Sequence, residues 1–129
     1  MKNPYISNSA IISSARIEKL KRAITTHGSL VIGLDYDNTV RGYKSKEAYT
    51  DIVDIAKLAI EKGHILCIWT ANAEEEEVKK DLTSLGINFH HYNTSPLFND
   101  RRKPHFNILL DDIAGLNESY HTLMEILKD

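Results

Sequence analysis

The sequence predicts an α/β protein, a three-layer α/β/α sandwich built around a central parallel sheet of about four strands. Short apolar runs, each typical of a strand buried on both faces, alternate along the chain with segments of helical periodicity. Strands that alternate with helices are joined by right-handed crossovers, and these produce a parallel sheet. The connections between the segments are short, so residues 1–129 are expected to form a single domain.

The strands are expected where apolar residues run almost without interruption. The first run ends at Leu34, and the second extends from His64 to Trp69. The third is an alternating segment that places Ile87 and Phe89 on one face. The expected strands span residues 30–34, 64–69, 87–92 and 107–111.

The helices are expected where apolar residues recur at intervals of three or four positions. Gly28, Gly63 and Gly86 follow the first three of these segments and provide their stop signals. Asn72 is expected to cap the third helix, because Glu75 follows three residues later as in a capping box. The expected helices span residues 9–26, 46–62, 73–85 and 117–127, and residues 93–104 are expected to form a loop.

Composition excludes several classes of protein. The chain is 42% hydrophobic and 26% charged, which is ordinary for globular proteins and unlike disordered ones. A net charge of -2 gives no support for a strongly basic nucleic-acid surface, although a local basic patch stays open. No apolar stretch approaches the ~20 residues of a membrane span. Because Cys67 is the only cysteine, an internal disulfide is excluded, and a cytoplasmic location is expected.

Polar side chains follow three of the four expected strands. Asp35 and Asp37 come after the first strand, Thr70 after the second, and Asp111 and Asp112 after the fourth. Ligands of open parallel sheets bind beyond the carboxyl ends of the strands, so these groups are expected to converge. Four carboxylates gathered at one edge repel one another and require a cation. Mg²⁺ is the natural choice for oxygen ligands of this kind.

The same edge is expected to bind an anion. Lys103, in the loop before the fourth strand, supplies a positive charge. Thr70 and Ala71 stand where the third helix is expected to begin, so a hydroxyl and backbone N–H groups are available there. Carboxylates, a hard metal ion, a lysine and a helix N-terminus together suit a phosphate group.

Four segments of the chain resemble the motifs of the haloacid dehalogenase (HAD) superfamily. Residues 35–40, Asp-Tyr-Asp-Asn-Thr-Val, resemble its first motif, Asp-x-Asp-x-Thr after an apolar strand. Residues 68–70 resemble the second motif, Lys103 the third, and residues 109–112 the fourth. The motifs stand in the family's order between about residues 30 and 114. The resemblance implies a Rossmann-like, HAD-type fold and a phosphatase.

The resemblance also implies roles for the two acids of the first motif. Asp35 would attack phosphorus and form an aspartyl-phosphate, a known form of carboxylate catalysis. Asp37 would protonate the leaving oxygen and then activate the water that hydrolyses the intermediate. The expected activity is therefore Mg²⁺-dependent hydrolysis of a phosphomonoester.

Metal and phosphate ligands follow from the same resemblance. Mg²⁺ would be held by Asp35, by the backbone carbonyl of Asp37 and by Asp112. Asp111 and Thr39 would contact these ligands without binding the metal directly. Which of the paired acids binds the metal directly stays open. The residues expected to bind the phosphoryl oxygens are Thr70, Ala71 and Lys103.

The spacing of the motifs leaves no room for a cap domain. Only 30 residues separate Thr39 from Thr70, and a helix and a strand take up most of them. An open site is therefore expected, and the resemblance implies a small metabolite, a nucleotide or a larger phosphorylated substrate. Residues 41–46 are basic and contain an aromatic side chain, so they either contact a phosphodiester backbone or form a solvated loop. Homo-oligomerisation also stays open.

The main alternative is a catalytically silent HAD-fold domain that serves as a binding or interaction module, since a fold alone does not prove activity. Both first-motif acids, Lys103 and Asp112 are present, and a module that only binds needs no such set. A phosphate-receiving signalling domain carries its paired acids early in the chain, whereas here they come last. Mg²⁺-dependent turnover separates the enzyme from the module.

Overall fold

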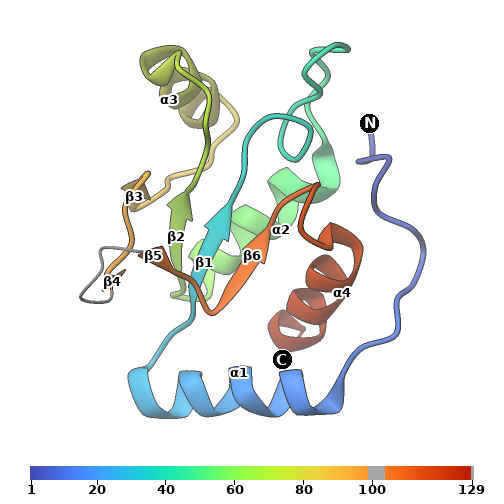
Figure 1. The fold of residues 1–129 in the computed structure, drawn as a ribbon, viewed down its shortest axis with the longest axis vertical. Coiled ribbons are helices and arrows are strands. Elements are labelled where there is room, and N and C mark those ends of the chain that lie inside the picture. The colour runs from blue at the N-terminus through green and yellow to red at the C-terminus, as the bar shows by residue number, and fades with distance from the viewer. Residues whose placement is uncertain (99–103, 129) are drawn as a thin grey trace.

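Four parallel strands form the central sheet, in the order β3–β2–β1–β6 (Figure 1). The computed structural model describes residues 1–98 and 104–128. The sheet strands are β1 (Val31–Leu34), β2 (Ile65–Ile68), β3 (His91–Tyr92) and β6 (Ile108–Leu110). The predicted fold class is confirmed: the chain is an open, Rossmann-like α/β sandwich with a four-stranded parallel sheet and four flanking helices.

The central strand β1 aligns the ends of its neighbours. Leu34 pairs with Ile68 of β2 on one side and with Leu110 of β6 on the other, so these three strands end level with one another. All four residues of β1 are buried, as predicted for a strand covered on both faces. Gly33 is required there because a Cβ at this position would lie 2.7 Å from the Phe106 ring. The residues that follow β1, β2 and β6 therefore share one edge of the sheet.

Four helices flank the sheet: α1 (Ser14–His27), α2 (Thr50–Glu61), α3 (Glu75–Ser84) and α4 (Leu116–Leu127). α2 packs against β2 and α4 against β6, and the two helices also contact each other. α1 contacts α4 and runs past the amino ends of the strands, whereas α3 lies toward their carboxyl ends (Figure 1). The helices bury a continuous apolar core that includes Leu20, Ile55, Leu82 and Leu123.

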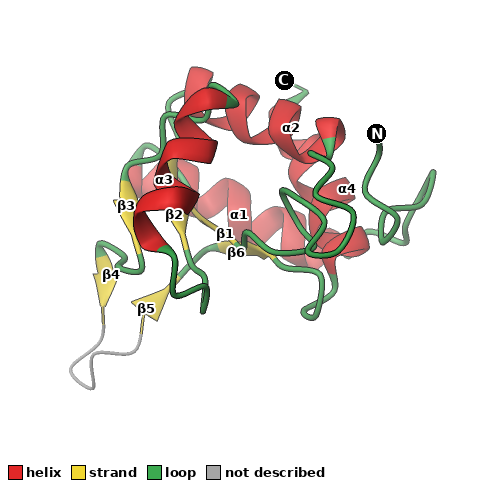
Figure 2. Ribbon diagram, turned by 90° about the horizontal axis from the view of Figure 1, so that it is seen from above, coloured by secondary structure: helices red, strands yellow, loops and turns green. Residues whose placement is uncertain are grey.

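Two expected segments differ from the sequence prediction. The third strand is reduced to His91–Tyr92, because the Leu66 N–H donates to the His90 side chain (Nδ1, 2.9 Å) and not to a backbone carbonyl. Within the expected loop 93–104, β4 (Leu97–Phe98) pairs antiparallel with β5 (Pro104–His105). This pair lies on the β3 side of the molecule, away from α4 (Figure 2). Residues 99–103 lie outside the described part of the chain.

Three helices, α1, α2 and α3, begin later than predicted. α1 begins at Ser14, with the Ser13 hydroxyl accepting a hydrogen bond from the Arg16 N–H (3.2 Å). α2 begins at Thr50, because the preceding residues bridge back to Arg41. Among the helices of the described residues, none has the length and apolar character that crossing a membrane requires.

Candidate active site

The chain turns sharply after β1, and this turn presents the first-motif side chains. The Asp35 N–H still belongs to the sheet, since it donates to the Leu110 carbonyl (2.9 Å). The Tyr36 carbonyl then accepts hydrogen bonds from three successive N–H groups, those of residues 39–41. Asn38 adopts a left-handed conformation (φ 63°), which asparagine tolerates better than most residues. The turn is therefore fixed by its own backbone.

Three carboxylates meet at the ends of β1 and β6. One oxygen each of Asp35, Asp111 and Asp112, the acidic cluster, lies within 4.8 Å of the others. The Thr39 hydroxyl is fully buried among them, 3.3 Å from Asp35 Oδ2 and 3.3 Å from Asp112 Oδ1. It also accepts a hydrogen bond from the Asp112 N–H (3.0 Å). Since this hydroxyl has one proton, it satisfies only one of the two carboxylates at a time.

The surroundings of Asp35 raise the pKa of its carboxyl group. Burial, a hydrogen bond shared with Asp112 and the charge of Asp111 together raise the pKa of Asp35 to about 8. A divalent cation among these oxygens would compensate the repulsion and return Asp35 to its ionised form. Three converging carboxylates are a suitable donor set for a hard cation such as Mg²⁺. The residues present therefore fit the expected metal.

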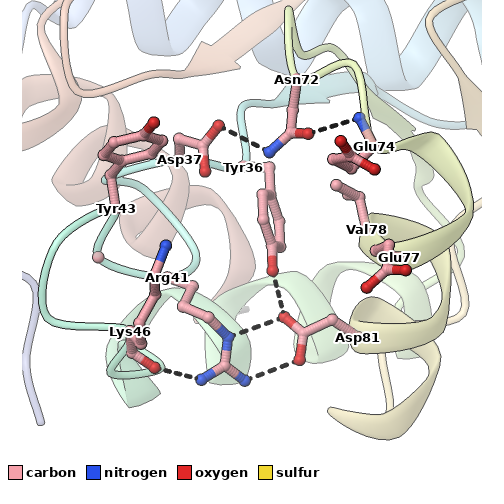
Figure 3. Close-up of a pocket in the computed structure, with 11 residues that line it drawn as sticks. Tyr36, Asp37, Arg41, Tyr43, Lys46, Asn72, Glu74, Glu77, Val78 and Asp81 are labelled. Atoms are coloured by element: carbon pink, nitrogen blue, oxygen red, sulfur yellow. Dashed lines mark hydrogen bonds and ion pairs between the residues drawn. The ribbon is translucent and has the colours of Figure 1, made fainter.

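Asp37 stands apart from the acidic cluster and has its own partner. Its Oδ2 accepts a hydrogen bond from Asn72 Nδ2 (3.0 Å), and Asn72 Oδ1 accepts one from the Glu74 N–H (2.8 Å). The expectation that Asn72 caps the third helix is wrong, because α3 begins at Glu75 with Glu74 in the cap position. Asn72 instead fixes the loop between β2 and α3 against Asp37 (Figure 3).

Thr70 and Ala71 lie at the site, but not at a helix N-terminus as predicted. Four residues, 71–74, separate Thr70 from α3. The Thr70 N–H donates to Asn93 Oδ1 (2.8 Å), and its hydroxyl accepts from the Asn72 N–H (3.1 Å). The hydroxyl proton can still be donated to a ligand. Lys103, the expected phosphate-binding lysine, lies outside the described residues.

Two adjoining cavities open at this edge of the sheet. The main cleft, about 620 Å³, brings together five of the predicted site residues: Asp35, Asp37, Thr70, Ala71 and Asp112. The side pocket, about 470 Å³, extends toward α3 (Figure 3) and shares five lining residues with the main cleft: Asp37, Tyr43, Lys46, Asn72 and Glu74. Asp111 belongs to the acidic cluster without lining either cavity.

An ion pair closes the far end of the side pocket. Asp81 of α3 accepts two hydrogen bonds from the Arg41 guanidinium (2.9 and 2.8 Å) and one from the Tyr36 hydroxyl (2.6 Å). Burial alone would raise the pKa of Asp81, but these hydrogen bonds and the Arg41 charge outweigh it and lower the pKa. Arg41 Nη1 also donates to the Lys46 carbonyl (2.6 Å). Through these contacts Arg41 connects the loop of residues 41–46 to α3 (Figure 3).

The N-terminal segment contacts the turn that follows β1. The Asn3 side chain, 1% exposed, donates through Nδ2 to the carbonyls of Asn38 (3.1 Å) and Thr39 (2.9 Å). Its own N–H donates to the Asp51 carboxylate at the start of α2 (3.1 Å). Sequence reasoning missed Asn3 because it is 35 residues or more from its partners and belongs to no motif.

Comparisons with known proteins define the fold and leave the activity open. No family model matches the chain. No curated protein matches it either. A solved structure described as that of a conserved protein from Bacteroides thetaiotaomicron is similar, with a TM-score of 0.61 and 21% sequence identity. The similarity covers 78% of this chain and 90% of the other, and it shows a shared fold.

Proposed function

We propose that the protein is a Mg²⁺-dependent phosphomonoester hydrolase of the haloacid dehalogenase type. One observation carries the proposal: the acidic cluster converges beside a fourth carboxylate, Asp37, that has a separate environment. The cluster suits a hard cation, whereas Asp37, oriented by Asn72, suits proton transfer. Carboxylates with different environments at one cleft are typical of acid–base and nucleophilic roles divided between neighbours.

Asp35 is the proposed nucleophile. An oxygen of its carboxylate attacks phosphorus, the bond from phosphorus to the leaving oxygen breaks, and an aspartyl-phosphate forms. Asp37, in its acid form, donates its proton to the leaving oxygen, so that the product departs as a neutral alcohol. The resulting Asp37 carboxylate then takes a proton from water, which attacks phosphorus, releases phosphate and restores Asp35.

Mg²⁺ would be held by Asp35, by the Asp37 backbone carbonyl and by Asp112, and it would neutralise the charges of the carboxylates and the phosphoryl group. We favour Asp112 over Asp111 as the direct ligand because Asp112 lines the main cleft. The other acid, Asp111, uses Oδ1 to accept a hydrogen bond from the Ile113 N–H (2.9 Å).

Phosphoryl oxygens are proposed to bind at the start of the loop after β2. Thr70 can donate its hydroxyl proton there, and the adjacent backbone at Ala71 lines the same cleft. Lys103 is proposed to contribute a positive charge. We further propose a cytoplasmic protein acting on a phosphorylated substrate that reaches an open cleft.

Release of phosphate from p-nitrophenyl phosphate tests the proposal. We expect turnover with Mg²⁺, none with a chelator, and none in Asp35→Asn. Asp54→Asn is the matched control, because it removes an exposed acid on α2 that lines neither cavity of the site. If Mg²⁺ raises the melting temperature of the wild-type protein but no phosphate is released, the activity is wrong and the silent binding module is favoured.

Asp37→Ala tests the division of roles. It removes the acid–base group but leaves the backbone carbonyl proposed for the metal. We expect turnover to fall by about 10²- to 10⁴-fold while Mg²⁺ still raises the melting temperature. Full turnover in this variant would contradict the assignment of Asp37.

A further inference from the structure

We propose that the side pocket binds the leaving group of the phosphomonoester and selects an uncharged, hydroxyl-bearing group over an anionic one. The inference rests on the proposed function and adds a class of substrate to it. Three features of the pocket carry it: its place beside Asp37, the charges of its walls, and the prior engagement of its other polar groups.

The position of the pocket follows from the direction of the reaction. In phosphoryl transfer the attacking and leaving oxygens lie roughly in line, on opposite sides of phosphorus. Asp35 lines the main cleft but not the side pocket, whereas Asp37 lines both. The leaving oxygen must reach the Asp37 proton, so the group attached to that oxygen extends into the side pocket. Its volume, about 470 Å³, falls in the range of small-molecule sites.

The walls of the pocket carry an excess of negative charge. Tyr43 and Lys46 stand on one side, and Glu74 and Glu77 on the other (Figure 3). Arg41 and Asp81 neutralise each other at the far end. While Asp37 is in its acid form, the carboxylates of Glu74 and Glu77 face the ammonium group of Lys46, which leaves one negative charge in excess among the described residues of the pocket.

The polar groups that remain available define the ligand. Both Asn72 amide atoms are already hydrogen-bonded, and Arg41 is bound to Asp81. In the part of the chain that the structure describes, no ion pair engages the side chains of Glu74 or Glu77. These carboxylates can only accept hydrogen bonds while ionised, and hydroxyl groups are suitable donors. Lys46 Nζ, 4.8 Å from the Tyr43 ring centroid, offers a donor from the opposite wall.

An anionic leaving group is disfavoured at the same place. A second phosphate would lie beside Glu74 and Glu77 and would be repelled by both. Arg41, the one arginine of the basic segment 41–46, is not available to compensate it. The pocket therefore favours small phosphomonoesters with an uncharged leaving group over polynucleotide ends, whose leaving groups carry further phosphates.

A pair of substrates that differ by one phosphate tests the proposal, with fructose 6-phosphate against fructose 1,6-bisphosphate and p-nitrophenyl phosphate as the activity control. We expect kcat/KM to be higher for the monophosphate. Glu77→Gln should raise the relative kcat/KM for the bisphosphate by roughly three- to tenfold, and high ionic strength should reduce that effect. Glu76→Gln is the matched control, an exposed acid on the same helical turn that lines neither cavity, and it should leave the ratio unchanged.

Each contrary outcome has a distinct meaning. If the wild-type protein prefers the bisphosphate, or if the two variants change the ratio equally, the pocket does not select by charge and the inference is overturned while the phosphatase stands. If p-nitrophenyl phosphate is not hydrolysed either, the proposed function fails and the inference fails with it.

Discussion

Asn72 Nδ2 lies 3.0 Å from Asp37 Oδ2, and this single amide connects the loop after β2 to the acid of the first motif. The other amide atom, Oδ1, accepts from the Glu74 N–H, so the side chain has little freedom to rotate. Asp37 is thereby held at the junction of the main cleft and the side pocket. The direction of its carboxylate depends on a residue outside the four motifs.

Replacing Asn72 by Asp tests this dependence with little change in shape. Aspartate retains an oxygen for the Glu74 N–H but loses the donor to Asp37 and adds a like charge beside it. We expect kcat to fall by about ten- to hundredfold, because the acid is misdirected and lies beside a like charge. The pH–rate profile should move toward higher pH, whereas the Mg²⁺ concentration for half-maximal stabilisation should not change. An unshifted profile would mean that Asn72 does not act through Asp37.

The protonation of Asp35 predicts a pH-dependent stability of the metal-free protein. Because its pKa is about 8 when folded and ordinarily 3.8, the folded state binds more protons between these values. The contribution of Asp35 to the free energy of unfolding is therefore fully present below pH 3.8 and is lost as the pH rises through about 8. In a chelator, thermal unfolding should occur at a lower temperature at pH 9 than at pH 5, apart from effects of other groups.

Asp35→Asn isolates that contribution. The amide cannot ionise, so the variant should lose the decline between pH 5 and pH 8 and should melt above the wild-type protein in chelator at pH 8. Mg²⁺ should raise the melting temperature of the wild-type protein and have little effect on the variant. A variant that melts at the wild-type temperature throughout this pH range would show that burial and the neighbouring carboxylates do not raise the pKa of Asp35.

The bidentate pair between Arg41 and Asp81 should contribute more than an exposed ion pair. Their side chains are 26% and 22% exposed, and the Tyr36 hydroxyl adds a third hydrogen bond. A double-mutant cycle with Arg41→Ala and Asp81→Ala should give a coupling free energy of about 1 kcal/mol in urea unfolding. The coupling should decline in acid, as the pH falls through the lowered pKa of Asp81.

The pair Lys79–Glu75 on α3 is the matched control for that cycle. It is more exposed, at 36% and 53%, and has the ordinary i,i+4 spacing of a helix surface. Its coupling should be about 0.3–0.5 kcal/mol. Equal coupling energies for the two pairs would show that the Arg41–Asp81 geometry adds no stability.

The sequence predicted the strands and the acidic residues at their carboxyl ends, because both depend on local patterns of residues. Continuous apolar runs located the strands, and the acids that follow them met at one edge because Leu34, Ile68 and Leu110 share a register. Thr70 and Ala71 line the cleft as expected, although the helix that follows them begins later in the chain than predicted. The polar sequence Thr-Ala-Asn was open to either a cap or a loop, and tertiary contact with Asp37 decided between them.

Side-chain hydrogen bonds between segments far apart in the sequence could not be predicted. The His90 imidazole accepts a hydrogen bond from the Leu66 N–H in place of a backbone carbonyl, and this shortens the third strand. A hydrophobic pattern does not predict such a replacement of a backbone acceptor by a side chain. Asp81 has the spacing of an ordinary solvent-facing helix residue, and only the packing of α3 brings it to Arg41. Such contacts depend on three-dimensional proximity between segments 24 and 40 residues apart.

Asn3 offers the last test, because it joins the N-terminal segment to the loop that carries Thr39. Asn3→Ala leaves the part-buried carbonyl of Asn38 and the buried carbonyl of Thr39 without that donor and should lower the free energy of unfolding by about 1–3 kcal/mol. Asn8→Ala, at an exposed asparagine in the same segment, should leave it unchanged. Urea unfolding with and without Mg²⁺ measures both effects.

The same change should also weaken binding at the proposed metal site. The Thr39 hydroxyl lies between Asp35 and Asp112, so a loosened Thr39 backbone should raise the Mg²⁺ concentration needed for half-maximal stabilisation. We expect a rise of about tenfold in Asn3→Ala and none in Asn8→Ala. If Asn3→Ala loses stability but keeps its Mg²⁺ midpoint, the N-terminal segment supports the fold alone. A shifted midpoint makes Asn3 a positioning residue for the acidic cluster, acting through Thr39 from outside every recognisable motif.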